Sequence, residues 1–176
     1  RFTDPEKAYS SRTSIHVHMN CLNLEDHQVR RIVLFYALFE EAFFQLVAPA
    51  RRDNIHCVAL VETFLPTFYG LSLKGMVSRW SKYTALNLLP LSVYGTLEFR
   101  HMHGHNDLEG LSAWLGVLER LFTLGKTTSL DEKTLTQDNM SAWFGFIFGQ
   151  HPMYKELYPQ LVKLTRNSVI DVKMGL

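Results

Sequence analysis

Within the stretch SRTSIHVHMN near the start of the chain, polar and apolar residues alternate from Ser14 to Asn20. A period of two is typical of a β-strand that buries one face and leaves the other exposed or functional. The pattern therefore predicts a strand over residues 12–20 with two histidines on its polar face. The apolar set is Ile15, Val17 and Met19, and the polar set is Ser14, His16, His18 and Asn20.

A second alternating run lies in YGTLEFRHMHG, between Gly95 and Gly104. These two glycines bound the run as a turn signal would, so a second strand is predicted here. One face is expected to carry Leu97, Phe99 and His101, and the other Thr96, Glu98, Arg100 and Met102.

Between and after these strands the apolar positions recur at helical spacing. The first predicted helix follows Asn23, a candidate cap, is apolar on most of its circumference and ends at Pro49. The second opens at Asn106 or Asp107 and stops at Gly125. Two shorter helices are predicted over 139–149 and 153–164. The apolar face of the second helix is expected to be Leu108, Leu111, Leu115, Leu118 and Leu121.

Alternating strands separated by helices are typical of an α+β fold with an antiparallel sheet packed against helices. The length of 176 residues suits a single domain over 1–176. The chain begins with Arg1 rather than Met and shows no signal peptide, which indicates a piece of a longer or processed polypeptide.

Composition and charge exclude some classes of partner. A net charge of +1 provides no general field for nucleic acid. No apolar run reaches the roughly 18–20 residues of a membrane helix, so no membrane partner is expected. Two cysteines, Cys21 and Cys57, make no disulfide framework and favour a reducing, cytoplasmic compartment. The phosphate-loop, dinucleotide and nucleophile-elbow glycine motifs are absent from the sequence.

Two groups of polar residues on the predicted strands suggest chemistry. His16, His18 and Asn20 share one face, and neutral imidazole is a good metal ligand. Glu98 and Arg100 share another, where a carboxylate suits a hard cation and a guanidinium grips a carboxylate or phosphate. Solvated histidines and an ordinary cross-strand charge pair are the structural alternatives.

Two further groups are weaker candidates. A zinc site on His101, His103 and His105, with Cys57 or an outside carboxylate, would make the chain a zinc hydrolase. The scattered arginines Arg12, Arg51, Arg52 and Arg79 lie near turns or strand edges, and they gain interest only where a phosphate chain must be neutralised.

Taken together, SRTSIHVHMN, RWSKYTALNLLPL and YGTLEFRHMHG resemble the amidoligase family of the glutamine synthetase-like carboxylate–amine ligase superfamily. The resemblance covers roughly residues 12–124. It implies a sheet of the glutamine synthetase-like catalytic-domain type, whose inner face binds ATP and a divalent metal, Mg²⁺ or Mn²⁺.

The resemblance also implies roles for single residues. His16 is similar to a histidine that places a metal and the acyl substrate, and His18 to one that contacts the nucleotide phosphates. Asn20 stands near the nucleotide. Glu98 resembles the carboxylate that ligates the metal bridging the phosphates, and Arg100 the arginine that holds the substrate carboxylate or acyl phosphate.

The arginines would complete this site. Arg79 resembles an arginine that neutralises the transferred phosphoryl group, and Arg51 or Arg52 would do the same. Arg12 would bind substrate beside Arg100.

The implied function is an ATP- and Mg²⁺-dependent ligase that joins a small-molecule or peptide carboxylate to an amine through an acyl phosphate. The superfamily's earlier half brings a Glu-x-Glu pair for the catalytic metals, and no such pair occurs in these residues. Either that segment precedes Arg1, or the chain is a non-catalytic structural or interaction protein that keeps the ligase fold. In the second case it would assemble as an oligomer or as part of a phage particle.

Overall fold

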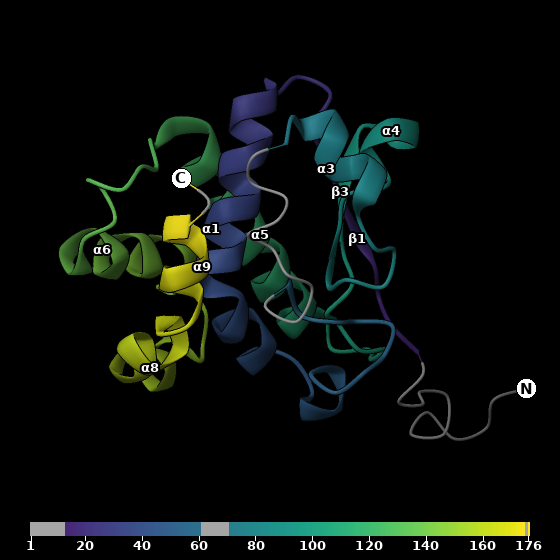
Figure 1. Cartoon of the computed structure of the whole chain (residues 1–176). Helices are drawn as coiled ribbons and strands as arrows, with labels where there is room; N and C mark the ends of the chain where they lie inside the picture. Colours follow the sequence, from purple (N-terminus) through teal and green to yellow (C-terminus); the bar gives the residue numbers. More distant parts are fainter. Residues whose placement is uncertain (1–12, 61–70, 175) are drawn as a thin grey trace, which may run out of the picture.

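The computed structural model describes residues 13–60, 71–174 and 176. Within them, three short strands form one antiparallel sheet in the order β1-β3-β2. The strands are β1 (Val17–Asn20), β2 (Leu86–Asn87) and β3 (Thr96–Phe99), with β3 in the centre. Helices pack against one side of this sheet, so the predicted α+β class is confirmed (Figure 1).

The predicted alternation is confirmed within the two strands, which are shorter than the predicted runs. It fails beyond β3, where Met102, expected on the polar face, is 4% exposed and belongs to the core. Along β1 the exposed residues alternate with half-buried ones, and Val17 and Met19 pack against the core. In β3, Leu97 and Phe99 are fully buried. The Phe99 ring contacts Tyr36 on one helix and Phe122 on another, so this face of the sheet is the one that the helices cover.

Helix α1 (Asp26–Gln45) runs through the centre of the molecule and is buried on most of its circumference, as its sequence predicts. Its N-terminal cap is Glu25 rather than Asn23, because Glu25 and Gln28 form a reciprocal capping box. The helix also ends earlier than predicted, at Gln45. Pro49 opens the short 3-10 helix η2 (Pro49–Arg51) instead of terminating α1.

Helix α5 (Leu108–Thr127) packs along α1 and extends two residues past Gly125, the predicted stop. A Cβ at Gly125 would lie 2.3 Å from Ile32 Cγ1 and 2.9 Å from its backbone nitrogen, so this glycine lets the two helices approach closely. The predicted apolar face is partly wrong, since Leu108 is 78% exposed and Leu115 37% exposed. The buried stripe is rotated to Trp114, Val117, Leu118, Leu121, Phe122 and Leu124.

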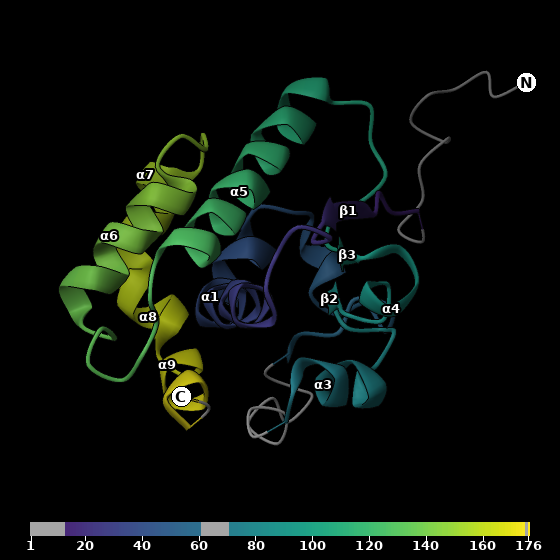
Figure 2. The same ribbon diagram turned by 90° about the horizontal axis from the view of Figure 1, so that it is seen from above.

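The helices that follow α5 lie on the side of α1 away from the sheet (Figure 2). The prediction over 139–149 corresponds to α6 (Gln137–Phe148). The prediction over 153–164 is broken into α7 (Tyr154–Leu157), η4 (Tyr158–Gln160) and α8 (Leu161–Thr165), with Pro159 inside the break. Helix α9 (Ser168–Met174), which packs on α1, was not predicted.

Two short helices lie next to β2 in the sequence. Helix α3 (Leu73–Arg79) precedes β2, and α4 (Leu91–Tyr94) joins β2 to β3. Gly95 caps α4 with φ of 65°, a left-handed conformation that glycine adopts without strain. Among the described helices, none is long and apolar enough to cross a membrane.

Candidate functional site

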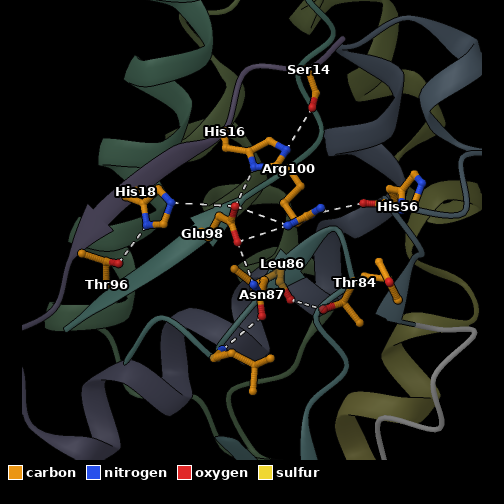
Figure 3. Close-up of polar contacts among 12 residues, drawn as sticks. Ser14, His16, His18, His56, Thr84, Leu86, Asn87, Thr96, Glu98 and Arg100 are labelled. Atoms are coloured by element: carbon orange, nitrogen blue, oxygen red, sulfur yellow. Dashed lines mark hydrogen bonds and ion pairs between the residues drawn. The ribbon is translucent and has the colours of Figure 1, made fainter. Parts of the chain in front are cut away.

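Pairing of β1 with β3 brings the two predicted polar groups together. In this antiparallel register the Cα atoms of His18 and Glu98 are direct partners. Side chains of directly opposed residues lie on the same face of a sheet, and a period of two adds their second neighbours. His16, His18, Glu98 and Arg100 therefore lie on one face, opposite the face that carries Leu97 and Phe99 (Figure 3).

The carboxylate of Glu98 is the centre of this group, which we call the Glu98 cluster: Glu98 with His16, His18, Arg100 and Asn87. Oε1 of Glu98 lies 2.6 Å from His16 Nδ1 and 3.8 Å from His18 Nε2. Arg100 Nη1 is 3.4 Å from both carboxylate oxygens. Asn87 Nδ2 donates to Oε2 at 2.7 Å. The Glu98 side chain is 8% exposed, so these contacts replace most of its hydration.

A second ring of hydrogen bonds fixes the two imidazoles. Ser14 Oγ lies 2.9 Å from His16 Nε2, and Thr96 Oγ1 lies 3.0 Å from His18 Nδ1. The edge of the Tyr94 ring also meets the His18 ring, with centroids 6.4 Å apart. Both histidines thus have a fixed orientation although their side chains are 32% and 40% exposed.

The arginine and the asparagine of the cluster are held in the same way. Arg100 Nε donates to the carbonyl of His56 at 3.1 Å. Asn87 Oδ1 accepts from the backbone of Leu89 at 3.1 Å, which aims its Nδ2 at Glu98. Nη2 of Arg100 makes no hydrogen bond to the described residues, and the side chain as a whole is 16% exposed.

The protonation states follow from these contacts. Burial alone would raise the pKa of Glu98, but the Asn87 hydrogen bond and the charge of Arg100 outweigh it and lower the pKa. Burial lowers the pKa of His16, and Arg100 lowers it further, against the opposing effect of Glu98. At neutral pH the site therefore combines an ionised carboxylate, a guanidinium and a neutral His16. Neutral His16 donates from Nδ1 to Glu98 and accepts from Ser14 at Nε2.

A divalent cation would find few ligands here. Magnesium takes oxygen ligands and is often bound by one or two carboxylates plus substrate phosphates. Glu98 offers one such carboxylate, and the imidazoles of His16 and His18 are better suited to softer ions. Among residues 13–60 and 71–174, no three His, Cys, Asp or Glu side chains are grouped to hold a metal. The donor set offers a hard cation one carboxylate, that of Glu98, with the imidazoles of His16 and His18 beside it.

Asn20, predicted to lie near a nucleotide, ends β1 on the same exposed face. Its Oδ1 accepts from the backbone of Leu22 at 2.9 Å, a local turn contact. Its role in binding stays a prediction.

The predicted arginines are not gathered in one place. Arg51 is buried, and its Nε and Nη2 donate to the carbonyls of His101 and Arg100 at 3.0 and 2.6 Å. Arg52 pairs with Glu41 at 2.9 Å and lies over the Phe44 ring.

Arg79 ends α3 and is exposed, without a hydrogen bond or ion pair to any described member of the Glu98 cluster. Arg12 lies outside the described residues. Phosphate contacts by these arginines stay predictions.

The structure does not support a zinc site on the three histidines and Cys57. His101 is fully buried against α1, where its Nε2 lies 2.7 Å from the Tyr36 hydroxyl. His103 and His105 lie beyond it, with their rings 4.8 Å apart. Cys57 is buried as a free thiol, and burial raises its pKa to about 11, which disfavours the thiolate that zinc requires.

Sequence reasoning missed Asn87, the shortest contact to Glu98 apart from His16. Asn87 and Glu98 are Cα partners in the β2–β3 pairing. The only signal was a polar residue inside the apolar run TALNLLPL, which does not by itself identify a strand two residues long.

Comparison with known proteins gives no relative for this chain: no family model, no curated protein and no solved structure matches it.

Proposed function

We propose that the chain is an ATP- and magnesium-dependent carboxylate–amine ligase of the amidoligase type, or the C-terminal portion of one. The observation that supports this is the convergence of His16, His18 and Arg100 on Glu98 across two paired strands. These are the residues that the family resemblance assigns to substrate, phosphate and metal. A glutamine synthetase-like sheet type is part of the same proposal.

The cluster offers the donors that this chemistry needs. A carboxylate is a poor electrophile, and ATP, as a substrate, would activate it as an acyl phosphate. Transfer of a phosphoryl group depends mainly on positioning and on neutralising charge. Arg100 has a free Nη2 on a guanidinium that Glu98 and the His56 carbonyl hold still, which suits a carboxylate or phosphate oxygen.

Bound magnesium would neutralise the phosphate charge, with Glu98 as the protein ligand. The exposed edges of His16 and His18 would contact phosphate or acyl oxygens from the same side. His18 would be the imidazole that donates to such an oxygen from Nε2, because the single N–H of neutral His16 already donates to Glu98.

The test is amide formation and ADP release by the full-length protein with a panel of carboxylates and amines. Arg100→Lys keeps the charge but loses the planar donor pair, and it should reduce turnover by about tenfold or more, the value of one charge-assisted hydrogen bond. Glu98→Gln should raise the magnesium concentration that half-saturates the reaction. Glu132→Gln, in an exposed loop, is the matched control and should leave both unchanged.

A non-catalytic role is the second candidate, and one observation favours it. Glu98 already has three hydrogen-bonding or ion-pair partners within 3.4 Å, so the cluster is internally satisfied like a structural polar network. In that case the folded full-length protein would bind no ATP and make no amide, and it would co-purify as a stoichiometric member of an assembly. That result would overturn the ligase proposal.

A further inference from the structure

A cavity of about 390 Å³ lies between the start of α5, the segment after β3 and the turn after α6. Its volume is at the small end of the range for small-molecule sites, roughly 300–1,000 Å³. No member of the Glu98 cluster borders it. Six of its lining residues carry polar groups that matter here: His103, His105, Asp107, Glu109, Trp114 and His151.

The three histidines of the cavity share one tautomer. In each, Nδ1 accepts a hydrogen bond from a backbone N–H, at 3.4 Å for His103, 3.1 Å for His105 and 3.2 Å for His151. A ring nitrogen that accepts carries no hydrogen, so in a neutral imidazole the proton must be on Nε2. Burial lowers the pKa of both His103 and His151, which favours their neutral form. Each ring therefore presents an N–H donor at Nε2.

Not all of these donors are already used. Nε2 of His105 lies 3.0 Å from the sulfur of Met102, a weak acceptor. Nε2 of His103 and of His151 makes no hydrogen bond to the described residues. Two imidazole N–H groups at this cavity are thus free to donate.

Trp114 adds an unpaired buried donor next to this cavity. It is 1% exposed and borders the cavity, yet its Nε1 has no hydrogen-bond partner among the residues that the structure describes. Buried donors are almost always paired, because an unpaired one costs about 1–3 kcal/mol. Trp80 shows the ordinary case, with its Nε1 donating to Thr84 Oγ1 and to the Leu86 carbonyl. The Trp114 indole is therefore a donor that lacks an acceptor.

Carboxylates lie beside these donors. Asp107 and Glu109 are exposed residues at the start of α5, and Asp107 Oδ1 also caps the helix by accepting from Gly110 at 3.0 Å. Two negative charges would repel a simple anion. They would attract the ammonium group of a ligand whose other end is a carboxylate.

We propose that this cavity binds a free α-amino acid. The imidazole N–H groups of His103 and His151 would hold the α-carboxylate, and Asp107 with Glu109 would hold the α-ammonium, with the buried Trp114 ring forming part of the cavity wall. The site does not depend on ligase activity, because none of its residues belongs to the Glu98 cluster.

The indole N–H resonances of the full-length ¹⁵N-labelled protein test this directly. Titration with L-alanine, L-glutamate and L-phenylalanine should move the Trp114 signal saturably for at least one of them. The Trp80 signal, which comes from a paired indole, should stay in place as the internal reference. Acetate and methylammonium each carry half of the recognised groups and should bind at least tenfold more weakly.

His151→Asn is the sharpest variant. Asparagine Oδ1 can still accept from the backbone N–H of Met153, so the local turn keeps its hydrogen bond while the Nε2 donor is lost. Affinity should fall about fivefold to tenfold, the value of one hydrogen bond. Trp114→Phe assigns the indole signal by removing it. Binding to that variant is followed through the histidine ring signals.

Three results would each overturn the proposal. They are no saturable shift with any of the three amino acids, equal affinity for acetate, and unchanged affinity in His151→Asn. The proposal is independent of the ligase assay, because amino-acid binding is read from the protein's own resonances.

Discussion

The buried imidazole of His101 makes the stability of the fold sensitive to acid. It is 0% exposed and packs among Phe43, Phe44, Phe99 and Trp114. The Tyr36 hydroxyl donates its proton to Glu40, so its oxygen must accept from Nε2 of His101. Protonation would place a charge on Nδ1, which has no hydrogen-bond partner among the described residues. Burial, helped by the nearby charge of Arg51, therefore lowers the pKa of His101 from 6.5 to about 3.

This shift fixes both the sign and the size of the effect. Below pH 6.5 the unfolded chain takes up a proton at His101, and the folded chain does so only near pH 3. Because the unfolded state binds more protons, acidification lowers the free energy of unfolding throughout this window. One pKa unit corresponds to about 1.4 kcal/mol, so the loss between pH 7 and pH 5 is about 2 kcal/mol. It is complete only near pH 3.

The variant His101→Phe isolates this contribution. Phenylalanine fits an aromatic surrounding and does not titrate, while every other group titrates in both proteins. We expect the difference in unfolding free energy, wild type minus variant, to fall by about 2 kcal/mol from pH 7 to pH 5. Urea unfolding at pH 7, 6 and 5, followed by tryptophan fluorescence, measures it.

A core variant that removes no titrating group is the control. Phe144→Leu trims a fully buried ring, and its difference from wild type should not change with pH. A wild type minus His101→Phe difference that stays constant within about 0.5 kcal/mol from pH 7 to pH 5 would refute the reasoning. In that case His101 would titrate alike in the folded and unfolded chains.

Two further predictions concern packing and the Glu98 cluster. Gly125→Ala forces a Cβ against the backbone of α1 and should destabilise the fold by about 1–3 kcal/mol in urea unfolding. Gly116→Ala, whose Cβ meets only the tip of an arginine side chain, should instead be neutral or stabilising by up to about 1 kcal/mol. Because Arg100 lowers the pKa of His16 and Glu98 raises it, Arg100→Gln should raise that pKa and Glu98→Gln should lower it. NMR titration of the His16 ring checks this, and shifts of the same sign in both variants would contradict it.

The sequence predicted the structure well where a single repeat of apolar residues determined which side chains are buried. Strand alternation correctly separated Leu97 and Phe99 from Glu98 and Arg100, because successive side chains of a strand point to opposite faces. The prediction failed where one helix had more than one apolar face that could have been buried. In α5, leucines at 108 and 115 matched a helical face as well as Trp114 did, and only packing against α1 selects the buried one.

Helix ends were the least predictable feature for a related reason. Gly125 is a typical stop signal, yet here it serves the contact with α1, a tertiary requirement that local propensity does not contain. The same holds for Glu25, which caps α1 through its partner three residues later. The sequence therefore indicates candidate caps, and tertiary contacts determine which of them ends the helix.

It was predictable that the histidines of one strand and the Glu98–Arg100 pair of the other would come together. When two alternating strands pair, their polar side chains lie on the same face of the sheet. The register that places His18 opposite Glu98 was not predictable, since a slip of one residue would turn one set inward.

Arg51 shows why such details depend on tertiary contacts. Beyond β3 the pairing shifts by one residue: Val17 is opposite Phe99, whereas Ser14 is opposite His103. The extra residue on this side is the signature of a β-bulge, which leaves ladder groups unpaired. The buried guanidinium of Arg51 donates to the carbonyls of Arg100 and His101 within that irregular stretch. Arg51 was predicted to contact phosphate. In the structure its side chain fixes the backbone of Arg100, which reaches Glu98, and of His101, which enters the core.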